Sequence, residues 1–447
     1  MSQQKTTDYE ITNFSLTLNN GEQIDLRNIF QEINIHDSMF TPCITGSVLI
    51  MDAVGLTNRL RFDGTESLLL EIGKTGGALK FRQAFRVHKL SDRKYLNQNT
   101  EIFSLHFVSD EYILSKQLKV NRSFYQTTYD RMVSIILKDY LNVERLIRSD
   151  TIGIKNIVVP NLSPLDTVLW LAKRSVDTYG SPNFFFFQNK LGYNFSSLSE
   201  IFKTQEVAKI NFDIKNLSEK NYNDDTGVQF GQQFLGARDV RVIEQYDFGD
   251  NISSGVYASS LIGFDPITRK VKEQQLDFKK IYDKNAHLGP VPNIGEMINQ
   301  NKTTNFDSFQ SRRLLYSSGL DRESSNYIKN NDKLNYFIND NPDHIFERKA
   351  TLKNFLSKRV RVVMPGNFNL SSGFNVLLRF QEKQDQSLDA NNADYSLFGK
   401  YTIIGAKHII TYNKHETVFD AATDSSSYKQ LSQASSKATS IIEQYSI

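Results

Sequence analysis

The sequence contains almost no cysteine. Cys43 is the only cysteine among 447 residues, which excludes intramolecular disulfides and cysteine-rich metal sites. It follows Thr41-Pro42 in an apolar stretch, without the basic neighbours or helix N-terminus that would activate a thiol. We therefore interpret Cys43 as a small buried apolar side chain. A cysteine peptidase is not expected.

Long apolar runs and an excess of one charge are also missing. The strongly hydrophobic runs, such as 48–51, 168–172 and 184–187, are far shorter than the roughly eighteen residues of a membrane helix. Residues 1–10 are polar and lack the charged-then-apolar order of a signal peptide. With 53 basic and 50 acidic residues, the net charge is only +3. The composition predicts no membrane segment, no export by the general route and no specific nucleic-acid recognition.

Recognisable metal and phosphate motifs are absent too. The chain has seven histidines but no HExxH or HxH spacing. Two HxxxD spacings, His88 with Asp92 and His106 with Asp110, begin in predicted strands, where four residues span roughly 13 Å. His408 and His415 lie in a strand-and-turn region, and we interpret both as ordinary strand residues. The glycines near Gly64 and Gly76 do not form a phosphate loop. We predict no metal site and no cofactor site.

Acidic and basic clusters are present, but they are typical of solvated loops. The adjacent pairs Asp110-Glu111 and Asp224-Asp225 fall in predicted loops, although spacing alone does not exclude a glycosidase. The basic residues between Arg269 and Lys280 alternate with acidic ones, which favours a solvated face over a nucleic-acid groove. We predict no catalytic residues and no enzymatic activity. A peptidoglycan-degrading or carbohydrate-binding protein is the alternative hypothesis.

Strand-forming sequence dominates the first part of the chain. The stretch from Ile24 to Leu56 contains an alternating strand, an Asp37-Ser38 turn and an apolar strand interrupted by Gly46. Asn19-Asn20-Gly21 is typical of a tight hairpin turn. Further strands are predicted at 67–72, 81–90 and 101–108. Because closure removes unpaired strand edges, we predict that residues 1–111 form an antiparallel β-barrel.

After Tyr112 the apolar period changes from two to about 3.6, which indicates helices. A helix is predicted to begin near Thr128, and Ser163-Pro164-Leu165-Asp166 reads as an N-cap followed by a first-turn proline. A short buried strand at 184–187 would pair with 193–195. We predict an inserted α/β domain over residues 112–205.

The stretch from Ile24 to Leu56 has a weaker copy. Asp37 lies nine positions before Gly46, and Asp247 lies eight positions before Gly255 in a similar context. Later features repeat those of the first part in the same order, and they are Gly64 with Leu68-Leu70, Phe85-His88 and Glu101-Phe103, matched by Gly373 with Val376-Leu378, Ile404-His408 and Glu416-Phe419. We infer two related barrels, the second one interrupted by an insertion.

The predicted organisation of the rest of the chain follows from this repeat. Residues 206–265 form a linker, with a loop at 215–226, and the first part of the second barrel. Residues 266–350 form an insertion, 351–424 the remainder of the barrel, and 425–447 a helical tail with apolar residues at helical spacing.

The order of several short segments resembles the central baseplate hub protein of contractile-tailed bacteriophages of the T-even type, whose spike-bearing relatives occur in type VI secretion. The segments that carry the resemblance span most of the chain, and they are Asp25-Leu-Arg-Asn-Ile-Phe30, Asp37-Ser-x-Phe40, Gly46-Ser-Val-Leu-Ile-Met-Asp52, Ser163-Pro-Leu-Asp166 with Trp170-Leu171, Arg361-Val-Val-Met-Pro-Gly-Asn367, Leu370-x-x-Gly373 and Gly399-Lys-Tyr401 with His408.

The resemblance implies a mainly β fold with α/β insertions, in which two homologous antiparallel β-barrels form a pseudo-sixfold ring in a homotrimer. Such a ring would adapt the sixfold tail tube to a threefold central spike. The implied partners are tail tube or tube-initiator proteins and the central spike protein, with the tape-measure protein and the baseplate wedge as further candidates. The genome would pass through the lumen without sequence-specific recognition. The implied location is the tail baseplate of the virion, after assembly in the host cytoplasm.

Overall fold

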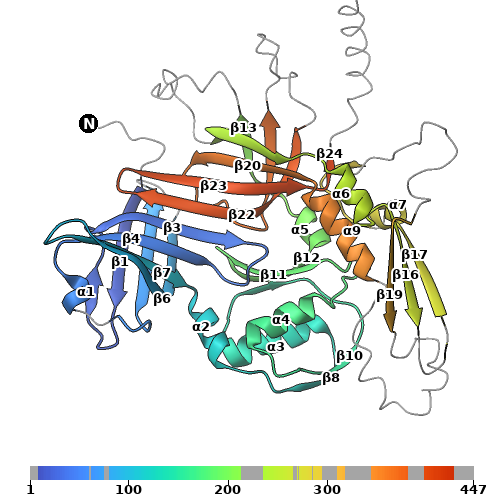
Figure 1. Ribbon diagram of the computed structural model, residues 1–447, viewed down its shortest axis with the longest axis horizontal. Helices are drawn as coiled ribbons and strands as arrows, with labels where there is room; N and C mark the ends of the chain where they lie inside the picture. Colours follow the sequence, from blue (N-terminus) through green and yellow to red (C-terminus); the bar gives the residue numbers. More distant parts are fainter. Residues whose placement is uncertain are drawn as a thin grey trace, which may run out of the picture.

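The computed structural model describes residues 9–59, 62–74, 80–212, 235–264, 269, 271–283, 285–293, 310–317, 344–380 and 397–426. Their backbone is mostly antiparallel β-sheet with a few short helices (Figure 1). No helix in this part of the chain is long and apolar enough to cross a lipid bilayer. The predicted mainly β fold is therefore confirmed.

Fourteen strands form one large sheet, and seven of them come from the first part of the chain. Their order across the sheet is β3-β4-β7-β6-β5-β1-β2, and each pairs antiparallel with its neighbours. The strands of this N-terminal half are β1 (Tyr9–Thr17), β2 (Gln23–Asp25), β3 (Phe30–Ser38), β4 (Thr45–Asp52), β5 (Ser67–Lys74), β6 (Lys80–Tyr95) and β7 (Glu101–Val108). Helix α1 (Leu56–Arg59) follows β4.

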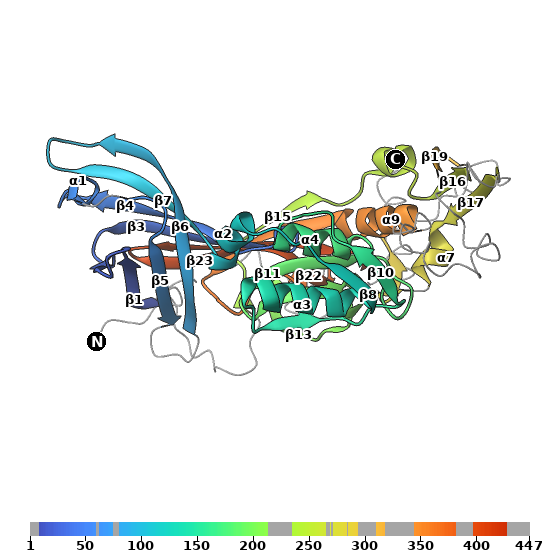
Figure 2. The ribbon, with the colours of Figure 1, turned by 90° about the horizontal axis from the view of Figure 1, so that it is seen from below.

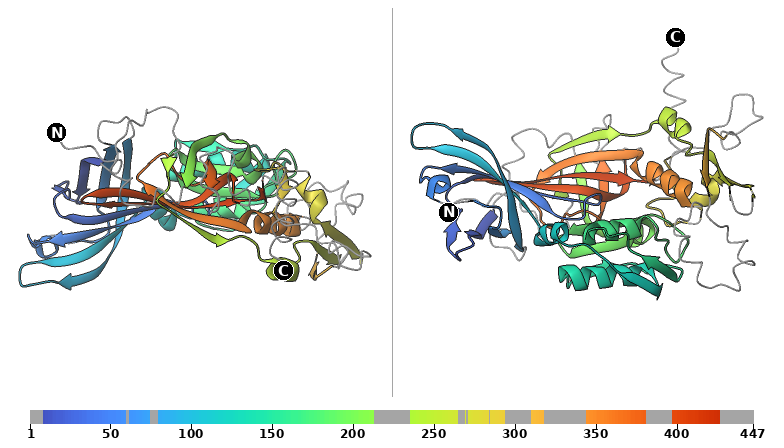
Figure 3. Two further views of the ribbon diagram at one scale, coloured as in Figure 1. Left: turned by 90° about the horizontal axis from the view of Figure 1, so that it is seen from above. Right: turned by 60° about the horizontal axis from the view of Figure 1, so that its bottom comes forward.

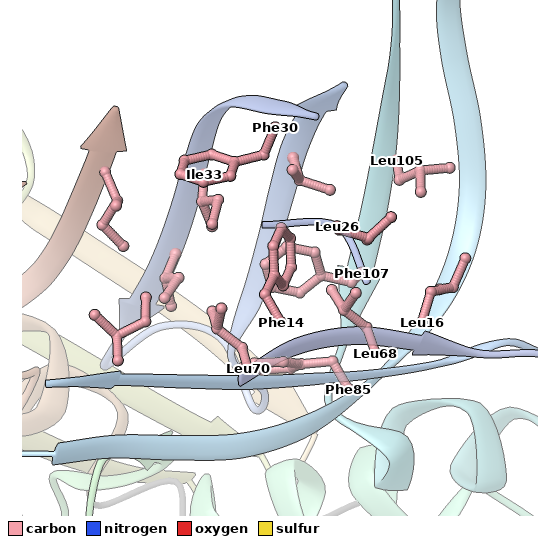
Figure 4. Close-up of a cluster of buried hydrophobic side chains, with 14 of the residues drawn as sticks. Phe14, Leu16, Leu26, Phe30, Ile33, Leu68, Leu70, Phe85, Leu105 and Phe107 are labelled. Carbon is pink, nitrogen blue, oxygen red and sulfur yellow. The ribbon is translucent and has the colours of Figure 1, made fainter. Parts of the chain in front are cut away.

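One apolar core lies inside the N-terminal half. Alternate residues of its strands point inward, including Phe14, Phe85 and Phe107, and all three are buried (Figure 4). Gly21 has a positive φ of +82° in the turn between β1 and β2, as its hairpin motif predicts. The described pairings do not join β2 to β3, so closure of this half into a barrel stays a prediction.

Seven later strands repeat this arrangement in the same order. The C-terminal half runs β15-β20-β23-β22-β21-β13-β14, which matches the N-terminal half strand for strand. Gly64 before β5 and Gly373 before β21 also share a positive φ, +87° and +82°. Its strands are β13 (Glu206–Phe212), β14 (Leu235–Gly236), β15 (Asp239–Glu244), β20 (Lys358–Pro365), β21 (Asn375–Phe380), β22 (Gly399–Thr411) and β23 (Lys414–Thr423).

One strand breaks the correspondence between the halves. Strand β13 pairs in parallel with both β21 and β14, whereas its counterpart β1 pairs antiparallel with β5 and β2. The reversed strand still contributes Ile210 to a separate apolar core that includes Val362, Tyr401 and Phe419. The two halves therefore share strand order but differ in the direction of one strand.

Residues between the halves form a small α/β unit, shown in green and cyan in Figure 1. The Ser163 hydroxyl accepts a hydrogen bond from the Asp166 amide and Pro164 is the first helical residue, so the predicted N-cap is confirmed. The elements of the unit are α2 (Asp110–Gln117), β8 (Ser123–Thr127), α3 (Tyr129–Leu141), β9 (Leu146–Arg148), β10 (Lys155–Val158), α4 (Pro164–Ala172), β11 (Phe184–Asn189), β12 (Gly192–Ser197) and α5 (Leu198–Lys203). The predicted pairing of β11 with β12 is also confirmed.

A second group of elements lies at the opposite end of the molecule from β1–β7 (Figure 3). Its core contains Val256, Tyr257 and Phe278. The group comprises α6 (Phe248–Ser253), β16 (Ala258–Phe264), β17 (Val271–Asp277), α7 (Phe278–Tyr282), β18 (Val291–Pro292), β19 (Arg312–Ser317), α9 (Ile345–Leu356) and β24 (Ser425–Ser426).

The predicted copy of β4 at Ser254–Tyr257 is wrong. Asp247 caps helix α6, because its carboxylate accepts a hydrogen bond from the Asp250 amide at 2.9 Å. The following strand β16 pairs with β17 and β19 in a separate three-stranded sheet. The true counterpart of β4 is β20, which pairs with β15 and β23. The excursion from the large sheet thus begins after β15, before the predicted boundary at residue 266.

Two predictions fall largely outside the described residues. The loop expected at 215–226 lies there entirely, and so does the tail helix apart from Ser425 and Ser426. These two residues form β24, which pairs with β18.

Candidate functional site: the junction between the two halves

The long strand β22 belongs to both halves of the sheet. Along one edge its first part pairs with β21 and its later part with β3, while β23 pairs along the other edge from Thr402 to Thr411. The register shifts between Ile403 and Gly405, where the partner along the first edge changes. Figure 1 shows β22 and β23 extending from the C-terminal half over β3. We call the contact between β3 and β22 the internal junction.

Asp37, near the end of β3, ties three segments together at the internal junction. Its buried carboxylate accepts hydrogen bonds from the Ser371 hydroxyl, from the Ser372 amide at 3.3 Å and from the Ala406 amide at 3.1 Å. Burial raises the pKa of Asp37 to about 6, although these hydrogen bonds act to lower it. Asp37 was predicted in a turn, and this is wrong because β3 continues to Ser38. The carboxylate instead holds the two halves together.

Replacing Asp37 by alanine should weaken the internal junction. The amides of Ser372 and Ala406 would lose their acceptor inside the protein, and we expect the free energy of unfolding to fall by about 3 kcal/mol. Asp37→Asn keeps one acceptor oxygen and the side-chain volume, so its loss should be about 1 kcal/mol. Urea unfolding followed by circular dichroism compares them. Equal stability of Asp37→Ala and wild type would show that these hydrogen bonds contribute nothing.

Two histidines predicted as separate strand residues, His408 on β22 and His415 on β23, meet at the internal junction. His408 Nδ1 lies 3.3 Å from His415 Nε2 and 3.1 Å from the Thr417 hydroxyl. Burial lowers the pKa of His408 to about 4 and also lowers the pKa of His415. Both rings are therefore neutral near pH 7. This arrangement can position the strands but carries no charge.

Phe368 extends the internal junction into the other half of the sheet. Its ring centroid lies 4.7 Å from that of His408, 4.3 Å from that of His415 and 5.2 Å from that of Phe81 on β6. Gly366 allows this packing, because a Cβ there would lie 2.0 Å from His415 Nδ1. A residue from the C-terminal half thus completes the core of the N-terminal half.

The remaining candidate side chains do not converge on a site. The side chains of the His106–Asp110 pair bind other partners, because His106 Nε2 contacts the Ser91 hydroxyl at 2.7 Å and the Asp110 carboxylate binds Arg86 at 2.8 Å. The rings of His88 and His106 face each other across β6 and β7 at 6.4 Å. Within the described ranges, no three His, Cys, Asp or Glu side chains are placed to hold a metal ion.

Cys43 is buried, as predicted, and its sulfur lies 3.5 Å from the Tyr193 hydroxyl. Burial raises the pKa of the Cys43 thiol to about 12, which keeps it protonated. Of the acidic pairs, Asp110-Glu111 was predicted in a loop, and this is wrong because the pair begins helix α2. Burial raises the pKa of Glu111. Asp224-Asp225 lies outside the described residues.

The sequence contained a signal for Asp37 that was missed. In β3 the inward positions are Ile33, Ile35 and Asp37, so the strand period places the carboxylate on the buried face. A buried carboxylate requires hydrogen-bond donors. Nothing in the local sequence identifies Ser371 and Ser372 as those donors, since they lie far along the chain.

No protein-family model matches the sequence, and no curated protein matches it significantly. Two solved structures are similar to it over nearly their whole length. A tail protein from Neisseria meningitidis is 8% identical with a TM-score of 0.50, and the match covers 93% of this chain and 97% of that one. The 43 kDa tail protein of prophage MuSo2 from Shewanella oneidensis is 10% identical with a TM-score of 0.51, covering 93% and 98%. The chain therefore has the fold of tail proteins, one of them encoded by a prophage, in agreement with its resemblance to the baseplate hub.

Proposed function

We propose that this protein is a structural component of a contractile phage tail, in which three copies form a baseplate hub. The observation that carries the proposal is the repeated order of seven strands in the two halves of one chain. Three chains with two equivalent halves each would present six similar surfaces to a sixfold tail tube while keeping threefold symmetry for a central spike. The fold shared with two tail proteins supports the same role.

The proposed ring consists of six β-barrels, one from each half. Each half has its own apolar core, and the internal junction joins the two halves of one chain through paired strands. A rigid joint suits a symmetry adaptor, because the tube-facing surfaces must keep a fixed spacing. The proposed partners are the tube or tube-initiator protein and the spike protein, and the proposed location is the virion tail after assembly in the host cytoplasm.

Light scattering coupled to size exclusion should give a molar mass of three times the 51.3 kDa chain. Averaged electron micrographs should show a ring with six lobes and threefold symmetry. A monomer at all concentrations, or a ring without six lobes, would contradict the proposal.

The role proposed here requires no catalytic group, and we propose that the protein is not an enzyme. A zymogram on peptidoglycan should show no clearing between pH 5 and pH 8. A cleared zone would instead support the peptidoglycan-degrading alternative.

Mass spectrometry of purified virions from the parent phage should detect the protein in the tail fraction.

A further inference from the structure

A second buried carboxylate, outside the internal junction, lies where the C-terminal half ends. Asp424 follows β23 directly, and its side chain is buried. Its Oδ1 accepts hydrogen bonds from the Leu288 amide at 3.1 Å and from the Ser425 hydroxyl at 2.9 Å. Its Oδ2 lies 2.6 Å from His287 Nδ1. The site adjoins helices α7 and α9, at the end of the molecule away from β1–β7 (Figure 2).

The imidazole of His287 has an oxygen acceptor at each of its two nitrogens. Nδ1 faces the Asp424 carboxylate, and Nε2 lies 2.6 Å from the backbone carbonyl oxygen of Tyr282. The ring stacks on the Tyr282 ring with centroids 3.4 Å apart and is only 15% exposed, which fixes its orientation. A neutral imidazole has one N–H, and a carbonyl oxygen only accepts. The two hydrogen bonds therefore need one more proton than a neutral histidine beside an ionised aspartate holds.

No other cation neutralises this carboxylate. Among the described residues, His287 is the only side chain that forms an ion pair with Asp424. Burial, Asp424 and the exposed Asp283 raise the pKa of Tyr282, so its phenol stays neutral. Strand β18 has no ionisable side chain. The charged side chains of α7, of α9 and of the residue before α9 bind other partners, and they are Lys280 with Asp277, His344 with Glu347, Arg348 with backbone carbonyls, Lys349 with the Ser254 carbonyl and Lys353 with Asp250. Because imidazole is a stronger base than a carboxylate, the extra proton makes His287 an imidazolium.

The pair of His287 and Asp424 connects two distant segments of the chain. The Asn293 amide donates to the Asp424 carbonyl at 3.1 Å, and β18 pairs antiparallel with β24. Asn354 Nδ2 on α9 donates to the same carbonyl at 2.9 Å. Residues 427–447 follow β24 in the chain. The site therefore holds the point at which this last segment is attached.

We propose that His287 and Asp424 form a proton-dependent latch that anchors β24, and with it the start of residues 427–447, to the segment that contains β18. Closing the latch takes up one proton wherever an exposed histidine is neutral, which is above about pH 6.5. The closed site binds this proton and the open site does not, so raising the pH favours the open state. The equilibrium constant for opening rises by up to about tenfold per pH unit. The latch does not depend on the proposed hub.

Hydrogen exchange of the full-length protein, followed by mass spectrometry at pH 7, 8 and 9, tests the latch. The amides of Leu288 and Asn293 donate to Asp424, so their exchange reports opening. Protection factors correct for the intrinsic effect of pH on exchange. We expect those of peptides covering 285–293 to fall by up to about tenfold per pH unit, whereas those of β4 stay constant. Constant protection of 285–293 in the wild type would overturn the inference.

The variant Asp424→Asn separates the extra proton from the shape of the site. Its carboxamide oxygen still accepts from the Leu288 amide, and its nitrogen donates to Nδ1 of a neutral His287, whose Nε2–H still reaches the Tyr282 carbonyl. We expect Asp424→Asn to keep the protection of 285–293 seen at pH 7 and to lose its pH dependence. A pH dependence equal to that of the wild type would contradict the latch.

The matched control is His287→Gln, which removes the positive charge beside an intact Asp424. A single amide group has no second donor in the direction of the Tyr282 carbonyl, so we expect low protection of 285–293 already at pH 7 and no further fall up to pH 9. Protection as high as in the wild type would show that the histidine does not hold the latch closed. Should His287→Gln fail to fold, the comparison of the wild type with Asp424→Asn decides alone.

Discussion

Replacing Gly46 by alanine is expected to lower the free energy of unfolding by about 3 kcal/mol. A Cβ at this position would lie 2.3 Å from Phe107 Cζ and 2.4 Å from the carbonyl oxygen of Asn34. Gly46 pairs with Ile35 on one side and Phe107 on the other, so β4 cannot move away from either neighbour without breaking a ladder. Phe107 is fully buried and its ring has little room to turn.

The matched control is Gly236→Ala on β14. A Cβ at Gly236 meets no atom within 4 Å, and no positive φ strains the substitution. Its effect on stability should be at most about 0.5 kcal/mol, and removing backbone freedom from the unfolded chain favours a small gain. Urea midpoints of both variants measure the difference. If the two lose equal stability, the cause is general loss of glycine and not the clash with Phe107 and Asn34.

Acid is expected to destabilise the protein through the buried histidines of the internal junction. The pKa of His408 falls from 6.5 to about 4 because the ring is buried, with nearby Lys190 and His36 acting in the same direction. The unfolded chain takes up this proton near pH 6.5, whereas the folded protein does not until pH 4. The stability contributed by the neutral ring is therefore complete above pH 6.5 and is lost as the pH falls towards 4. Between pH 7 and pH 5, His408 should account for a loss of about 2 kcal/mol, and His415 adds to it.

Asp37 has the opposite effect on the pH dependence of stability between pH 7 and pH 5. Its pKa rises from 3.8 to about 6 on folding, so it favours the folded state at low pH and this contribution is lost as the pH rises through 6. Asp37→Asn should therefore make the acid loss steeper, and His408→Gln should make it shallower. Urea midpoints of the wild type and both variants at pH 5, 6 and 7 measure these slopes. The same pH dependence in all three proteins would show that the junction does not control acid stability.

The repeat of strand order does not extend to the side chains of the internal junction. Asp37 on β3 and His408 on β22 both lie at this junction. The counterpart of His408 lies in the irregular part of β6 around Asp92, which has a positive φ of +54°.

Much of the local structure could be predicted because it depends on near neighbours. The alternating apolar residues of β1–β7, the turn at Gly21 and the N-cap at Ser163 all follow from side-chain direction and backbone geometry over a few residues. Short local patterns also allowed parts of the two halves to be matched in the sequence. These matches are Gly64 with Gly373, β6 with β22 and β7 with β23.

The amino-acid sequence by itself determined the strands, turns and helix caps, because each of these depends on residues close to one another. It also showed that the chain contains a repeat. Only the tertiary structure decided that β20 and not Ser254–Tyr257 completes the second half, that β13 runs in reverse, and that Asp37 meets Ser371. A strand pairs where its apolar face can be buried against another strand, and that strand can lie far along the chain. The pattern of a few neighbouring residues therefore does not determine which strands pair.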